Sequence, residues 1–293
     1  MTIGFLILAH KNSTQCLNLI DSLLHYKKAY VYVHVDLKAD VVYFKLLETY
    51  KNNPRVEIIN LRYKVYWGSY NQILATLALI QQSSKNKLLN YFCLLSAQDF
   101  PIKPLQLFAN FLSENNGTEF MVNFKLPDKQ WDGEGGLNRL NFYWRNQKNK
   151  QRMFLSDKLD AIIYYFHKIS GFRRKLKYNY YGGSNWFILT HNAIYFITEF
   201  IKNNPSYLKE FKYSRCADEM FIQSILLNSE YNSKVIADDL RYIDWISGPD
   251  SPKIFVNNDF EKLLSLKNKF FARKFDEIID AEIIVKLKKY IEQ

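Results

Sequence analysis

The sequence predicts an α/β fold in which a mostly parallel sheet is flanked by helices. Strand-like and helix-like patterns alternate over the first hundred residues, which is the order that parallel strands with crossover helices require. The chain has 293 residues, of which 48% are hydrophobic, so it can bury a large core. We therefore expect one domain over residues 1–293.

The first half of the chain supplies the alternating elements. Residues 3–9 are an apolar run typical of a buried strand, and a helix is expected from about residue 13 to residue 26. The next expected elements are a strand at 31–35, a helix at about 40–51, a strand near 56–60, a helix that begins at Ser69 and a strand at 90–95. Ser69 and Gln72 have the spacing of a capping box.

Polar residues follow three of these strands. They are His10, Asp36 and Asp99, and the carboxyl ends of parallel strands are where open α/β sheets bind ligands. Pro101 and Pro104 predict that sheet pairing has ended by Asp99, whose carboxylate would either cap a helix or line a site. Neither GxGxxG nor GxxxxGK[ST] occurs, so a dinucleotide fold or a P-loop is not expected.

The second half is more polar and aromatic. Residues 115–182 are expected to form loops that decorate the sheet, followed by a strand at 185–189 and helices at 192–201 and 220–227. Asp218 and Glu219 fall at the start of the last helix. Their carboxylates would either complement the helix dipole or provide a general base.

Charge and cysteine content narrow the function classes. Forty basic residues against 29 acidic ones give a net charge of +11, which favours nucleotides, phosphorylated lipid head groups or nucleic acid as partners. Residues 172–181 are basic and aromatic, but they match no known nucleic-acid-binding signature.

Three cysteines without a Cys-x-x-Cys spacing indicate reduced thiols, a cytoplasmic setting and no zinc site. No apolar run is long enough to span a membrane, so any membrane contact would be peripheral.

Eight short segments together resemble a known family. In chain order they are LILAHK (6–11), VHVD (33–36), WGSYN (67–71), LLSAQDFPIKP (94–104), GGSNWFILTH (182–191), CADE (216–219), DW (244–245) and FARKFD (271–276). Each segment is weak by itself, but all eight in this order resemble the core-2/I-branching β-1,6-N-acetylglucosaminyltransferases and the related protein xylosyltransferases.

The resemblance implies a GT-A-type glycosyltransferase fold, a UDP-sugar donor and an inverting reaction that forms a β-linkage. It also implies that basic side chains, in place of a metal ion, neutralise the departing diphosphate. The sequence agrees with this in having no Asp-x-Asp motif. The resemblance divides the chain into a nucleotide-binding half (1–114) and an acceptor-binding and catalytic half (115–293).

The resemblance also assigns residues. Glu219 matches the catalytic base and Lys274 a diphosphate-binding lysine, whereas the arginine that accompanies this lysine has no clean match, so Lys253 or Arg273 would replace it. The other residues assigned to the donor are His10, Asp36, Arg62, Ser69 and Asp99. The residues assigned to the acceptor are Arg139, Trp186 and Trp245.

The function expected from the resemblance is transfer of GlcNAc or xylose to a growing cell-surface glycan, which a lipid could carry. The animal enzymes have a membrane anchor and disulfides, and their lack here resembles a bacterial protein that is cytoplasmic or peripheral on the inner face of the membrane. The alternative from another class is a non-catalytic module that binds carbohydrate or nucleic acid through its aromatic, basic surface. A retaining transferase or a glycoside hydrolase is a weaker alternative.

Overall fold

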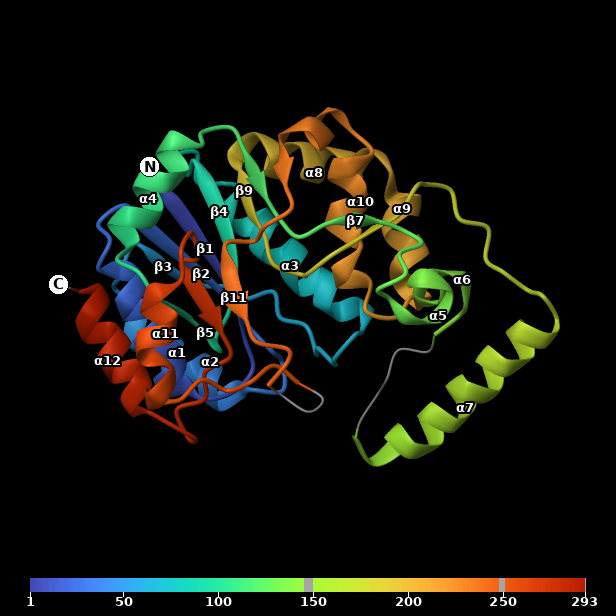
Figure 1. Ribbon diagram of the computed structural model, residues 1–293, viewed down its shortest axis with the longest axis horizontal. Coiled ribbons are helices and arrows are strands. Elements are labelled where there is room, and N and C mark those ends of the chain that lie inside the picture. The colour runs from blue at the N-terminus through green and yellow to red at the C-terminus, as the bar shows by residue number, and fades with distance from the viewer. Residues whose placement is uncertain (145–149, 248–250, 293) are drawn as a thin grey trace.

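A seven-stranded sheet lies at the centre of the computed structural model, which describes residues 1–144, 150–247 and 251–292 (Figure 1). The strand order is β10-β6-β9-β4-β1-β2-β3. Strands β1 to β4 are parallel to one another, and β9 is antiparallel to both of its neighbours. The predicted α/β fold class with a mostly parallel sheet is confirmed.

The strands of this sheet are β1 (Ile3–Ala9), β2 (Ala29–Val35), β3 (Val56–Ile58), β4 (Tyr91–Ser96), β6 (Glu119–Phe120), β9 (Ile188–Thr190) and β10 (Val235–Ile236). The main helices are α1 (Ser13–Leu24), α2 (Asp40–Tyr50), α3 (Tyr70–Ser83), α4 (Leu105–Glu114), α7 (Lys150–Ile169), α8 (His191–Asn203), α10 (Phe221–Leu227) and α12 (Glu282–Ile291). Shorter helices are α5 (Asp132–Gly135), α6 (Asn138–Asn141), α9 (Pro205–Glu210) and α11 (Phe260–Ser265). Single 3₁₀ turns are η1 (Phe211–Tyr213), η2 (Ala217–Glu219), η3 (Glu230–Lys234) and η4 (Asn257–Asp259).

Both faces of the sheet are buried, which explains why its central strands are apolar without alternation. In β1, Phe5 and Ile7 join a core with α1, α2, α4 and α12, whereas Leu6 joins a second core with α3, α8 and α10. β4 alternates in the same way, with Cys93 facing the first core and Leu94 the second. Because successive side chains point to opposite faces, a strand covered on both sides must be apolar throughout.

A second sheet corrects one prediction. Asp99–Pro101 form strand β5, which pairs antiparallel with β12 (Phe271–Arg273), and β12 pairs parallel with β11 (Arg241–Ile243). Pro101 therefore does not end sheet pairing, because it lies at the last position of an edge strand, where a missing N–H is tolerated. This sheet brings the C-terminal part of the chain against the segment that follows β4. A two-stranded sheet, β7 (Phe124–Lys125) with β8 (Tyr181–Gly182), lies beyond β6.

The predicted helices and strands of the first hundred residues are present, with ends that differ by a few residues. The capping box at Ser69 is wrong. Ser69 is the N-cap of α3, but its hydroxyl oxygen accepts from the backbone N–H of Tyr66 at 3.2 Å instead of from a helix amide.

Candidate active site

The ends of three parallel strands meet at one edge of the sheet. His10 follows β1, Asp36 follows β2, and β4 leads into Asp99. Backbone hydrogen bonds hold these ends together: Asp36 donates to Ala9 at 2.8 Å, and Ala97 donates to Leu8 at 3.0 Å. The prediction that these tips line one edge is confirmed.

Four cationic or titratable side chains gather at this edge, and we call His10, Lys11, Arg273 and Lys274 the donor-side cluster. Partial burial, and then the charges of Lys11, Arg273 and Lys274, lower the pKa of His10 against the opposing effect of Asp36. Burial, and then Arg273 and Lys11, also lower the pKa of Lys274. A cluster of positive side chains of this kind can bind an anion.

Two acidic side chains hold the cluster in place. The Lys11 ammonium lies 2.6 Å from the carboxylate of Asp276. Arg273 Nη1 lies 3.1 Å from Asp99 Oδ1. Within the described part of the chain, the Lys274 ammonium has no ion-pair partner, so it is the cation of the cluster that is free to bind an added anion.

Asp99 is completely buried and joins two arginines. Its Oδ2 accepts from the backbone N–H of Ser96 at 2.8 Å and lies 3.3 Å from Nε of Arg241. Both guanidinium groups, of Arg241 and Arg273, lie over the ring of Trp186 at 4.7 and 4.9 Å. Asp99 thus holds Arg273 in position. Arg241 was missed because nothing in RYIDW distinguishes a buried arginine.

The other predicted donor residues have partners of their own. Lys253 pairs with Asp259 at 2.6 Å. Arg62 donates to the carbonyls of Val35 and Asp36 and pairs with Asp40 at 2.8 Å, which ties β2 to α2. Of the two candidates for the second cation, only Arg273 lies in the donor-side cluster.

The predicted base is held on a separate loop. Glu219 ends the 3₁₀ turn η2, and its Oε2 accepts from Arg139 Nη1 at 2.5 Å. The Arg139 guanidinium also stacks on Trp131 at 3.7 Å from the ring centroid. Burial raises the pKa of Glu219, and the charge of Arg139 opposes this shift. The structure therefore joins the predicted base to the predicted acceptor arginine.

The neighbouring Asp218 has different surroundings. Its Oδ1 is buried without a hydrogen-bond partner among the described residues. Burial and the charge of Glu219 raise the pKa of Asp218. Of the two carboxylates that the sequence left open, Glu219 is the one with 35% of its side chain exposed and an oriented partner.

Two connections join the base to the donor-side cluster. The loop at 61–69 begins beside Asp36, because the carbonyl oxygen of Tyr63 accepts from the N–H of Leu37 at 3.0 Å. It ends at the turn of Glu219, where the carbonyl oxygen of Gly68 accepts from the N–H of Cys216 at 2.9 Å. On the other side, Gln223 of α10 donates to Ser184 at 2.6 Å, two residues before Trp186. Hydrogen bonds therefore connect the turn that contains Glu219 to segments beside the strand ends.

The tryptophans near the predicted site residues lie in different surroundings. Trp186, predicted for the acceptor, lies against the guanidinium group of Arg273. Trp245 is 64% exposed. It stands two residues after Ile243, which pairs with Arg273 between β11 and β12. Sequence reasoning missed Trp67, which is 75% exposed near Arg215, itself close to the ring of Trp144. The available signal was the position of Trp67 as the first residue of the motif WGSYN (67–71).

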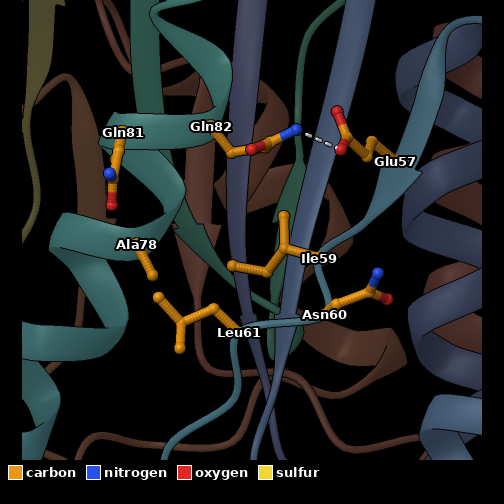
Figure 2. A pocket seen from close by; sticks show the side chains of 7 residues that line it. All are labelled: Glu57, Ile59, Asn60, Leu61, Ala78, Gln81 and Gln82. Carbon is orange, nitrogen blue, oxygen red and sulfur yellow. Dashed lines mark hydrogen bonds between the residues drawn. The ribbon is translucent and has the colours of Figure 1, made fainter.

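The described residues contain a cavity apart from the predicted site residues but no group that could hold a metal ion. Groups of three or more His, Cys, Asp or Glu that could hold a metal ion are not found there. A cavity of about 230 Å³ lies between the edge strand β3 and α3, and none of its lining residues is a predicted site residue (Figure 2). They are Glu57, Ile59, Asn60, Leu61, Ala78, Gln81 and Gln82.

No helix in the part that the structure describes is long and apolar enough to cross a membrane.

Comparison with known families identifies the family of the chain. The sequence model described as Core-2/I-Branching enzyme matches residues 3–266. The chain belongs to the core-2/I-branching enzyme family. The match covers all eight motifs except the last, FARKFD, so the base and the N-terminal strand ends lie inside it, and Lys274 lies just beyond.

Curated relatives are xylosyltransferases. The chain is 24% identical to xylosyltransferase oxt of Drosophila pseudoobscura pseudoobscura and 23% identical to human xylosyltransferase 1, with 99% of this chain aligned in both cases. It spans 33% and 30% of those proteins, about a third of their length. A solved protein from Bacillus anthracis, assigned as a glucose-1-phosphate thymidylyltransferase, aligns over 80% of this chain and 85% of its own with 9% identity and a TM-score of 0.37, too low to support a conclusion.

Membership confirms the predicted family, which is a family of glycosyltransferases. The mostly parallel sheet of this core-2/I-branching family member also agrees with the predicted GT-A-type fold.

Proposed function

We propose that this core-2/I-branching family member is an inverting, metal-independent glycosyltransferase that uses a UDP-sugar donor. The acceptor is a hydroxyl of a growing cell-surface glycan, and the product is a β-linkage. One observation carries the proposal: the chain presents an oriented carboxylate, Glu219, and a cationic cluster with a free ammonium, Lys274, on segments that hydrogen bonds connect.

The carboxylate and the cations each supply one half of an inverting transfer. Glu219 takes the proton from the acceptor hydroxyl as its oxygen attacks the anomeric carbon from the face opposite the nucleotide. The bond from the sugar to the diphosphate breaks, and its electron pair stays on the diphosphate oxygen. Lys274 and Arg273 stabilise the negative charge that develops there. A single positioned carboxylate suffices, in contrast to the two that a glycoside hydrolase needs.

The sugar is GlcNAc or xylose in this proposal. The matched family is described as core-2/I-branching enzymes, and the curated relatives are named xylosyltransferases. Both donors present the same UDP group to the donor-side cluster, so the cluster does not discriminate between them.

The test compares two glutamates that have similar surroundings. Glu219 and Glu134 each have 35% of the side chain exposed, and each pairs with an arginine, at 2.5 and 2.6 Å. We expect Glu219→Gln to lower transfer from UDP-GlcNAc or UDP-xylose by about a hundredfold or more, because the amide cannot accept the proton. UDP affinity, measured by calorimetry, should stay near that of the unchanged protein, and Glu134→Gln should retain activity.

Near-normal transfer by Glu219→Gln would show that the base is another residue. Inversion is tested by the configuration of the product, which NMR of the anomeric proton reports as β. The absence of any turnover, together with salt-dependent binding of polyanions, would favour the non-catalytic binding module instead.

A further inference from the structure

Helix α7 has one face that packs on the protein and one face that no other described residue covers. On its inner face, the rings of Tyr164 and His167 lie 4.8 and 5.8 Å from the ring of Phe142. Figure 1 shows the helix standing apart from the layered body of the molecule. Its outer face, which we call the α7 face, consists of Leu159, Ile162, Tyr165, Phe166 and Ile169.

The α7 face is a continuous apolar stripe. Leu159, Ile162, Phe166 and Ile169 follow one another at intervals of three, four and three residues, which places them on one side of a helix. Four of the five residues of the face are between 62% and 69% exposed, and Leu159 is 44% exposed. Contiguous apolar surface of this kind is rare unless it has a partner.

The charge around the helix indicates the partner. Residues 145–177 contain ten lysines and arginines and two aspartates, so this segment carries +8 of the net +11 of the chain. Within it, Lys168, Lys175 and Lys177 are exposed. An apolar face that includes aromatic rings, set in a basic segment, is the pattern of helices that lie in the interface of an anionic bilayer.

We propose that α7 docks on an anionic membrane surface, with the α7 face inserted among the lipid head groups and the surrounding lysines on their phosphates. A second copy of this chain is a poorer partner, because it would bring two segments of charge +8 together. Docking would also hold the acceptor side near the bilayer, since Phe142 follows α6, the helix that contains Arg139. The proposal stands whether or not the proposed reaction is correct.

The test is co-sedimentation of the full chain with vesicles of two compositions. We expect binding to phosphatidylcholine vesicles that contain about one third phosphatidylglycerol, and little binding to phosphatidylcholine alone. Binding to the acidic vesicles should weaken as salt is raised. The double change Phe166→Ser with Ile169→Ser should lower affinity by more than about tenfold, because it removes two apolar side chains from the interface.

A matched control lies on α2. Val41 and Phe44 are 83% and 63% exposed and have the same three-residue spacing as Phe166 and Ile169. Changing both to serine should leave vesicle binding unchanged. Replacing Lys168, Lys175 and Lys177 by glutamine should lower binding to acidic vesicles by about a hundredfold, since each lysine near the surface contributes roughly a factor of five.

Three outcomes would overturn the proposal. They are equal binding to neutral and acidic vesicles, an equal loss in the α2 control, and no vesicle binding by a folded protein. A dimer in sedimentation velocity that Phe166→Ser with Ile169→Ser dissociates, without vesicle binding, would show that the α7 face binds a second copy. Binding of single-stranded RNA without vesicle binding would assign the basic segment to nucleic acid. Melting temperatures of all variants report whether they are folded.

Discussion

The guanidinium of Arg139 lies between the ring of Trp131 and the carboxylate of Glu219. Its position has two consequences for the base. The hydrogen bond orients the carboxylate, and the positive charge opposes the effect of burial, which raises the pKa of Glu219. A general base must be deprotonated at the working pH, so in the proposed reaction Arg139 helps to keep Glu219 active at lower pH.

We therefore expect Arg139→Met to move the acid limb of the pH–rate profile to higher pH. The substitution removes a cause that lowers the pKa of Glu219, so the carboxylate stays protonated, and inactive, up to a higher pH. Arg139→Lys keeps a positive charge and should retain most of the original profile. The measurement is the pH dependence of kcat/KM for both variants. If the acid limb of the pH–rate profile does not move in Arg139→Met, this arginine does not influence the pKa of Glu219, and a role in binding the acceptor is left.

Lys274 and Lys253 offer a second comparison at the residue scale. We expect Lys274→Met to weaken UDP binding by about tenfold or more, because it removes the free cation of the donor-side cluster. Lys253 is already neutralised by Asp259 at 2.6 Å, so Lys253→Met should change UDP affinity little. Isothermal titration with UDP gives both values. A comparable loss in Lys253→Met would make Lys253 the second cation in place of Arg273.

The residues of the site were only partly predictable from the sequence. Glu219 and Lys274 were predicted because they stand in motifs that resemble a family, and their roles stay predictions. Lys11 and Arg241 were missed, although both determine the charge at the strand ends. Lys11 bonds to a carboxylate 265 positions away, and Arg241 donates to a carbonyl 147 positions away. Such pairs exist only after the two sheets have packed, so no local pattern records them.

At the scale of elements, Gly68 determines how the loop at 61–69 meets the turn of Glu219. Its φ is +68°, and an added Cβ would lie 3.0 Å from Sγ of Cys216. Its carbonyl oxygen also accepts from the N–H of Cys216 at 2.9 Å. A left-handed backbone and a close approach at one position both require glycine.

Gly68→Ala should therefore cost more stability than Gly171→Ala. Gly171 has the same φ of +68° but nothing within 4 Å of an added Cβ. Both variants should lose about 1 kcal/mol from the left-handed backbone, and only Gly68→Ala should lose more and also slow transfer. Urea unfolding and initial rates measure the two effects. Equal losses in both variants would show that the contact with Cys216 does not position the catalytic turn.

The predictability of elements depended on their length and burial. The seven-residue strands β1 and β2 and the six-residue β4 were predicted, because burial on both faces makes them continuously apolar. The three-residue strands β5 and β12 were not predicted, since each is defined by its pairing with the other. The hydroxyl oxygen of Ser69 accepts from the backbone N–H of Tyr66 in the preceding turn, a contact that the capping-box spacing does not reveal.

At the scale of the whole molecule, positive charge is concentrated in two places, for which we propose different partners. The donor-side cluster lies at the strand ends, where Asp99 and Asp276 hold its cations in position. The segment 145–177, which contains the α7 face, carries +8 of the net charge of +11 in the sequence. The total of +11 therefore does not describe one anion-binding surface, and removal of charge from one place should leave the other function intact.

Fixed cations at the donor end lead to a prediction for the intact enzyme. Lys274 and Arg273 can stabilise the departing diphosphate directly, and preorganised charges do this without a bound ion. We therefore expect transfer to continue at an undiminished rate in excess EDTA, and added Mn²⁺ or Mg²⁺ to raise it less than about twofold. The assay should use protein freed of metal by prior dialysis against chelator, with a metal-requiring transferase treated in parallel to show that chelation was complete. Loss of activity in EDTA that Mn²⁺ restores would mean that a metal ion, and not the donor-side cluster, carries the charge of the leaving diphosphate.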